Sequence, residues 1–146
     1  MTIALLLALV QAAALPAASI DGLPLGALPQ QALPAKGCAA YLFTTGETRV
    51  LAAMVTADPG SLRVALDGKV ADYPRIDGTD GRAATLGFTP EARFAAGDVS
   101  ATLDMRVEQR ATLGQGAAVP TATLRIDRAG RDTIVVPMAG LVGCSN

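Results

Sequence analysis

The most constraining feature of the chain is a strict alternation of apolar and polar residues over positions 98–110. The odd positions from Val99 to Val107 are apolar, whereas the even positions from Asp98 to Arg110 are polar or charged. A period of two over this length is typical of a β-strand with one face on a hydrophobic core and the other in water. We therefore expect a long strand with a core face made of Val99, Ala101, Leu103, Met105 and Val107.

The other face of this strand carries alternating charges and is the first place to look for catalytic carboxylates. Asp104 and Glu108 are four positions apart, so along an extended strand their side chains stand about 13 Å from each other. Glycoside hydrolases of either stereochemistry need a shorter separation. Because Arg106 and Arg110 lie next to these acids, we interpret the face as a solvent-exposed ladder of ion pairs.

A first hairpin is expected over residues 61–73. Asp67-Gly68 is typical of a two-residue type I′ turn, in which both central positions need positive φ. A two-residue loop fixes the register, which puts apolar residues on one face and an opposite-charge pair on the other. The predicted pairs are Leu66 with Lys69, Val64 with Ala71, Arg63 with Asp72 and Leu62 with Tyr73.

A last hairpin is expected over residues 121–139, with Arg128–Gly130 as a three-residue loop. A shorter Ala129-Gly130 loop would instead oppose Asp127 and Asp132, and two like charges directly across a sheet are destabilising. The predicted register pairs Asp127 with Arg131, Arg125 with Thr133, Leu124 with Ile134 and Ala122 with Val136.

Further strands are expected at 38–45, 48–57 and 82–89, one helical turn at 89–93 with Thr89 as its cap, and loops at 74–82 and 111–120. The run from Val50 to Val55 is apolar on both sides, which favours a strand covered on both faces. Together these elements predict an all-β fold: a single-domain antiparallel meander of about 7–8 strands that forms a β-sandwich or a small barrel.

The two cysteines bracket the expected domain. Cys38 precedes the first strand and Cys144 ends the last, so we predict a disulfide that closes a loop of about 100 residues. Its geometry requires the first strand to lie near the end of the last one. A two-thiolate metal site or a catalytic thiolate is disfavoured, because the chain contains no His to complete or activate it.

The N-terminal segment predicts export. Residues 3–15 are an apolar run of signal-peptide length, although no Lys or Arg precedes it. An uncleaved anchor is the alternative, but Pro16 interrupts the run well before a spanning length of about 20 residues. We divide the chain into a signal peptide at 1–19, a Pro/Gly-rich linker at 20–37 and the all-β domain at 38–146. The linker contains Leu-Pro steps without the PxxP spacing of polyproline ligands.

Several functions are disfavoured by composition. The formal net charge is −1 without a run of like charges, and aromatic residues make up only 3% of the chain, so nucleic acid is not an expected partner. No serine lies in a nucleophile motif, and the missing His removes the usual base. Asp77 and Asp80, in a turn-rich loop, are weak calcium candidates, but Asp and Gly at turns explain this segment equally well.

The sequence thus predicts a periplasmic or secreted β-domain of a bacterial envelope, without cofactor, catalytic residues or a stable membrane span after signal cleavage. Such a domain acts by binding an envelope protein or a small ligand. The alternative function is a β-barrel carrier with an apolar ligand inside, based on a composition that is 51% hydrophobic and rich in small residues. An enzyme of unknown type is the third hypothesis.

Overall fold

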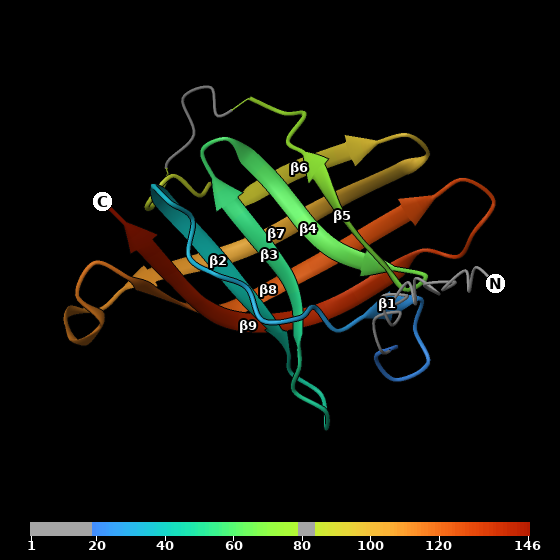
Figure 1. The fold of residues 1–146 in the computed structure, drawn as a ribbon, viewed down its shortest axis with the longest axis horizontal. Coiled ribbons are helices and arrows are strands. Elements are labelled where there is room, and N and C mark those ends of the chain that lie inside the picture. The colour runs from blue at the N-terminus through green and yellow to red at the C-terminus, as the bar shows by residue number, and fades with distance from the viewer. Residues whose placement is uncertain (1–18, 79–83) are drawn as a thin grey trace, which may run out of the picture.

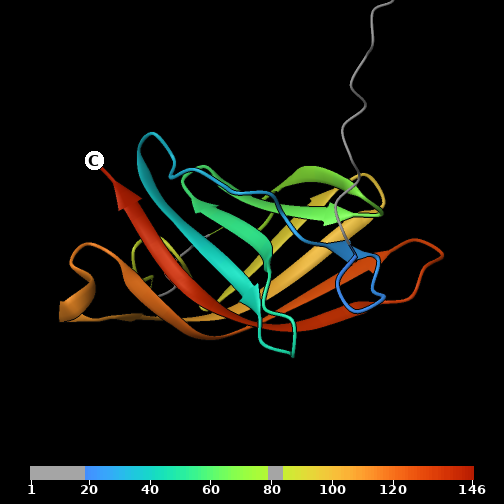
Figure 2. The same cartoon turned by 60° about the horizontal axis from the view of Figure 1, so that its bottom comes forward.

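The computed structural model describes residues 19–78 and 84–146. Within these ranges one antiparallel sheet curls into a half-barrel (Figures 1 and 2), so the predicted all-β antiparallel fold is confirmed. The strands are β1 (Leu25–Gly26), β2 (Gly37–Thr44), β3 (Leu51–Ala57), β4 (Gly60–Leu66), β5 (Lys69–Pro74), β6 (Glu91–Ala96), β7 (Val99–Gln109), β8 (Ala117–Arg128) and β9 (Ile134–Ser145), and a short 3₁₀ turn, η1, spans Ala111–Leu113.

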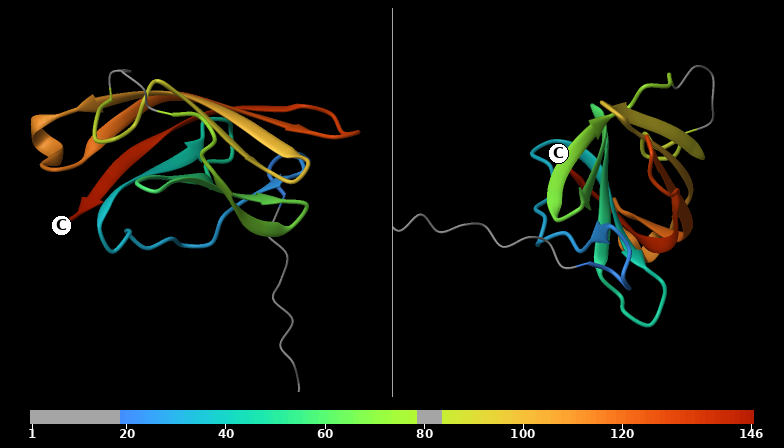
Figure 3. Two further views of the ribbon diagram at one scale, coloured as in Figure 1. Left: turned by 90° about the horizontal axis from the view of Figure 1, so that it is seen from above. Right: turned by 90° about the vertical axis from the view of Figure 1, so that its right-hand side faces the viewer.

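The sheet consists of two meanders joined through the last strand. Strands β2 to β5 pair in chain order, as do β6 to β9, and β9 then pairs with β2. Strand β1 pairs with the last two residues of β4, next to the point where the β3–β4 pairing ends. Figure 3 shows β9 curving from one meander to the other. The concave side of the curled sheet holds the core, where Leu42, Leu62, Phe94, Leu103 and Leu124 are almost completely buried.

Strand β9 pairs with one strand of each meander, and its backbone approaches that of β2 closely. Residues 134–142 of β9 pair with β8, and residues 138–145 pair with β2. At Gly140, where both pairings overlap, a Cβ atom would collide with the carbonyl oxygen of Tyr41 on β2. Only glycine fits here, because no other residue lacks Cβ.

The alternating strand of the sequence is β7. Ala101, Leu103 and Met105 are buried, with Val99 and Val107 half-buried at its ends. Its outer face is an ion-pair ladder, because Glu108 accepts contacts from Arg106 at 2.7 Å and Arg110 at 3.2 Å. Both interpretations of this stretch are confirmed.

The first hairpin has the predicted register: Leu66 faces Lys69, Val64 faces Ala71, Arg63 faces Asp72 and Leu62 faces Tyr73. Asp67 and Gly68 have φ of 49° and 80°, as the type I′ turn requires. The Arg63–Asp72 pair closes at 2.7 Å on the outer face.

The predicted register of the last hairpin is wrong. Leu124 faces Val136 instead of Ile134, and Ile126 faces Ile134. The connection between the strands is therefore longer than three residues, and the hydroxyl of Thr133 donates a hydrogen bond of 2.6 Å to Asp127 across it. A shift of two positions leaves every side chain on its original face.

Two expectations before β7 are also wrong. Residues 79–83 lie outside the described residues, but Thr85 and Phe88 form an isolated bridge around a tight turn rather than a strand over 82–89. No helical turn follows. Strand β6 begins at Glu91, and the Thr89 hydroxyl donates to the Glu91 carbonyl at 2.6 Å instead of capping a helix.

The segment expected to be a linker packs against the sheet instead. Leu25 is buried in the main core, whereas Leu28 packs on the outer face of the sheet beside Met54 of β3. Its backbone is anchored as well, because Leu28 donates to the carbonyl of Leu51 at 2.7 Å. This cover explains why β3 is apolar on both faces. The predicted signal peptide lies outside the described residues except for Ser19.

Cys38 and Cys144 form the predicted disulfide. They are directly opposed residues of β2 and β9, with Cα atoms 4.0 Å apart. The bridge therefore links the first long strand to the last one, where the two meanders join.

Candidate functional site

Three hairpin tips meet at one end of the half-barrel, on the right in Figure 1. They are the β4–β5 turn at Asp67, the β6–β7 turn at Asp98 and the β8–β9 turn that begins at Ala129. The Ala129 amide donates to the Asp98 carbonyl at 3.3 Å, and the Asp67 amide donates to Pro24 at 2.9 Å. Loops held by a rigid sheet are the usual position of binding residues. We call this region the tip end.

The three tips enclose a pocket of about 360 Å³, here called the tip pocket. This volume is at the small end of the range for small-molecule sites. Its wall is apolar, and its rim is charged and exposed. The wall contains Leu66, Ala71, Tyr73 and Val99, the rim contains Asp67, Lys69, Asp98 and Arg131, and Arg128 completes the lining.

Arg128, the last residue of β8, is the only charged side chain of this lining that is almost fully buried. Its side chain is 7% exposed, and its Nη1 donates to Asp67 at 2.6 Å. Its Nε is also buried but has no hydrogen-bond partner among the described residues. Leaving a buried N–H of a charged group unpaired costs about 1–3 kcal/mol or more, so this arrangement calls for an explanation.

Two other arginines of the protein show how the guanidinium edge formed by Nε and Nη2 pairs with a carboxylate. In Arg63, Nε and Nη2 donate together to the two carboxylate oxygens of Asp72, at 2.7 and 2.9 Å. In Arg125 the same two nitrogens donate to Asp127. Arg128 contacts its aspartate through Nη1 instead, so its Nε–Nη2 edge, the one suited to a bidentate carboxylate, holds no aspartate.

The electrostatics of the tip pocket favour a protonated phenol beside a net positive charge. Burial raises the pKa of Tyr73, the charges of Asp98 and Asp67 act in the same direction, and Arg128 opposes them. Tyr73 therefore keeps its proton near neutral pH and can donate a hydrogen bond. The lining holds three cationic side chains against two anionic ones, which leaves one positive charge in excess.

A larger groove of about 430 Å³ runs along β7 and β8 and includes Asp104. Its charged groups, Asp104 and Arg106, are exposed, and Glu108 is not part of its lining. Exposed charges are already solvated and gain little from a ligand. The groove therefore ranks below the tip pocket, although it has more volume.

A small pocket inside the half-barrel, lined mainly by residues of β3, β6 and β7 and of the segment before β6, measures about 10 Å³. This is about the space that one water molecule needs. Side chains such as Phe88, Phe94 and Met105 line it and fill the space around it. An apolar ligand does not fit there, so this part of the interior gives no support to the carrier hypothesis.

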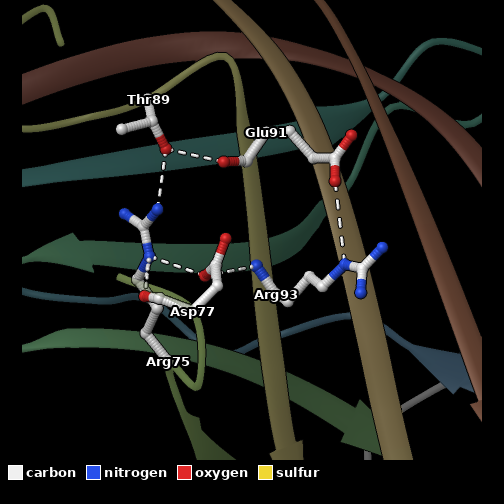
Figure 4. Close-up of polar contacts among 5 residues, drawn as sticks. All are labelled: Arg75, Asp77, Thr89, Glu91 and Arg93. Atoms are coloured by element: carbon white, nitrogen blue, oxygen red, sulfur yellow. Dashed lines mark hydrogen bonds and ion pairs between the residues drawn. The ribbon is translucent and has the colours of Figure 1, made fainter. Parts of the chain in front are cut away.

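Asp77, one of the two calcium candidates, belongs to a polar cluster that joins the sheet edges (Figure 4). Its carboxylate accepts hydrogen bonds of 2.9 Å from Arg75 Nε and from the backbone amide of Arg93. Arg75 also donates to Thr89 at 2.8 Å, and its backbone forms a bridge with Phe94 of β6. We call these contacts the seam cluster, because they connect β5 to β6.

The pKa of Asp77 is lowered in this setting. Burial acts to raise it, but the hydrogen bonds from Arg75 and from the Arg93 amide, together with the Arg75 charge, outweigh that effect. Asp80 lies outside the described residues. Among residues 19–78 and 84–146, no group of three or more His, Cys, Asp or Glu side chains is placed to hold a metal ion.

The sequence interpretation missed the tip pocket. It treated Asp67 as a turn residue and placed Arg128 in a loop, and nothing local in the chain shows that these residues meet. The signal that existed is indirect: each of the three hairpin turns carries a charged residue at its tip, and alternate turns of a meander point to the same end.

In the part of the chain that the structure describes, no helix is long and apolar enough to cross a bilayer. Compared with protein-family models, curated proteins and solved structures, the chain shows no match.

Proposed function

We propose that this protein is an exported, non-catalytic β-domain that binds its ligand or envelope partner at the tip end. The observation that carries the proposal is the buried guanidinium of Arg128, which lines the tip pocket with an unpaired Nε. Binding sites often keep such unsatisfied polar groups, because the ligand completes their hydrogen bonds.

Binding is favoured over catalysis by the chemistry of the lining. The cations Lys69, Arg128 and Arg131 line the pocket and attract an anion. Tyr73 remains protonated because its pKa is raised. Asp67 is already paired with Arg128 at 2.6 Å. The sequence contains no His to supply a general base.

Export is supported by the disulfide and by the predicted signal peptide. A bridge between Cys38 and Cys144 persists in oxidising compartments such as the periplasm or the extracellular space. The chain has no further cysteine that could exchange with it, so the pair suits a permanent structural role.

Native mass spectrometry of the exported protein tests this function. Protein recovered from the periplasm without denaturation should carry an additional mass, either a small molecule or a co-purified protein. Unfolding in urea with the disulfide intact, followed by refolding, should remove that mass, and adding back the periplasmic extract should restore it.

A matched pair of variants assigns the bound mass to the tip end. Arg128→Gln should reduce the bound fraction, whereas Arg125→Gln, which removes an exposed arginine three positions earlier on the same strand, should not. Equal loss in both variants would place the ligand elsewhere. Substrate turnover by the purified protein that a single substitution abolishes would contradict the non-catalytic function.

A further inference from the structure

The tip pocket also points to the chemical class of its ligand. Resting on the proposed function, we infer that the tip pocket binds a small organic monocarboxylate with an apolar body, whose carboxylate pairs with the guanidinium of Arg128.

The guanidinium edge selects a planar oxyanion. Arg63 and Arg125 each hold an aspartate carboxylate through this same edge. In Arg128 the contact to Asp67 occupies Nη1 only, and Nε has no partner among the described residues. Nε has almost no accessible surface in this structure, so a carboxylate reaches this edge only when the Arg128 side chain turns toward the pocket. It then meets the donor geometry that Arg63 and Arg125 offer to Asp72 and Asp127.

The charges of the rim limit the ligand to a single negative charge. Asp67 and Asp98 line the same pocket as the three cations, so the site has one positive charge in excess. A monocarboxylate neutralises that excess. A phosphate dianion would exceed it and would be repelled by the two aspartates.

The pocket wall requires an apolar body on the ligand. Leu66 is 7% exposed and Tyr73 is 9% exposed, and both present apolar surface to a volume of about 360 Å³. Bare acetate would leave most of this space to water. An aliphatic or aromatic acid fills it and gains the transfer energy of its apolar surface.

Titration of the ¹⁵N-labelled protein with defined probes tests the ligand class. Hexanoate and benzoate are the carboxylates, hexanamide and benzamide their neutral analogues, and phenyl phosphate the dianion. We expect both carboxylates to shift the amide signals of Asp67, Lys69, Val99 and Arg128 with saturation. The amides and phenyl phosphate should leave these signals in place at equal concentration.

Two variants test the role of Arg128. Arg128→Gln should weaken carboxylate binding about tenfold or more, the effect of losing a charge-assisted pair, and Arg125→Gln should bind like the native protein. Because Arg128 is buried, Asp67→Asn provides a second test that does not depend on how Arg128→Gln folds. Asp67 is exposed at a positive φ that Asn tolerates. Its replacement removes a charge that repels the ligand and leaves Nη1 with a neutral amide acceptor, so binding should become several-fold tighter.

The outcomes separate this inference from the proposed function. Saturation of the tip signals by a neutral probe or by phenyl phosphate, but not by the carboxylates, would overturn the ligand class while supporting a binding tip end. Carboxylate binding that Asp67→Asn weakens would overturn the role of Arg128. If no probe shifts the amide signals of the tip residues, the inference is overturned. The native mass measurement would still decide the proposed function on its own.

Discussion

Removal of the Cys38–Cys144 bridge should cost the protein several kcal/mol of unfolding free energy. The two residues are 106 positions apart in the chain. A cross-link over that length restricts the unfolded chain by about 16 cal/mol/K, which corresponds to about 4.8 kcal/mol at 25 °C. The folded state loses little else, because β2 and β9 stay paired along eight residue positions without the bridge.

The measurement compares the oxidised protein with a Cys38→Val/Cys144→Val double variant. Because the chain contains no Trp, unfolding is followed by far-ultraviolet circular dichroism in urea and on heating. We expect the melting temperature to fall by about 15 °C, given a few degrees per kcal/mol for a domain of this size. The urea m value should rise, since the unfolded chain becomes more expanded without its cross-link.

The control is a reducing agent, which should lower the melting temperature of the native protein to that of the double variant and leave the variant unchanged. Equal melting temperatures for the oxidised and reduced protein would refute the reasoning. They would mean that the two cysteines are not bridged or that the unfolded chain is compact without the bridge.

Three further substitutions test the packing described above. Gly140→Ala should destabilise the protein by about 3 kcal/mol in a urea titration, because its Cβ would collide with a backbone carbonyl of β2. Gly46→Ala is the control in the same titration, because its Cβ would make only an ordinary van der Waals contact. Arg75→Met should lower the free energy of unfolding by about 1–3 kcal/mol, because it breaks the part-buried seam cluster. Arg63→Met removes an exposed ion pair and should lower it by about 1 kcal/mol or less. Chemical denaturation of both variants measures the difference. Since the folded-state pKa of Asp77 lies below its unfolded value, its stabilising contribution is present above that unfolded pKa and is lost as the pH falls below about 4. Melting temperatures between pH 3 and pH 7 should therefore fall less steeply for Asp77→Asn than for the native protein, and identical slopes would contradict this.

Local patterns predicted those parts of the fold that depend on neighbours in the chain. The alternation of β7 and the Asp67-Gly68 turn each involve residues only a few positions apart, and both predictions are confirmed. The β8–β9 register failed because a slip of two residues preserves the alternation of faces. A contact across the loop, from Thr133 to Asp127, accompanies the true register, and no periodicity contains that information.

The misinterpreted N-terminal segment shows a different limit. Its Leu-Pro steps are typical of a linker, yet Leu28 covers the outer face of β3. The apolar run from Val50 to Val55 correctly indicated a strand covered on both faces. Composition alone does not say which segment covers it, because that depends on the curl of the whole sheet.

The tip pocket was beyond sequence analysis for the same reason. Arg128 lines a pocket built from three hairpin tips that are far apart in the sequence, and only the paired sheet brings them to one end of the half-barrel. A buried, partly unpaired guanidinium breaks the rule that buried polar groups are satisfied. Natural proteins break such rules at functional sites and compensate elsewhere.

The disulfide supplies compensation of the required size. It lies where β2 begins and β9 ends, near the chain terminus marked C in Figure 1, whereas the tip end is on the opposite side. Its contribution of about 4.8 kcal/mol exceeds the cost of about 1–3 kcal/mol for one unpaired charged N–H. A half-barrel held covalently at one end can therefore keep an unsatisfied arginine at the other, and a ligand that pairs with that arginine should stabilise the folded protein in addition to the bridge.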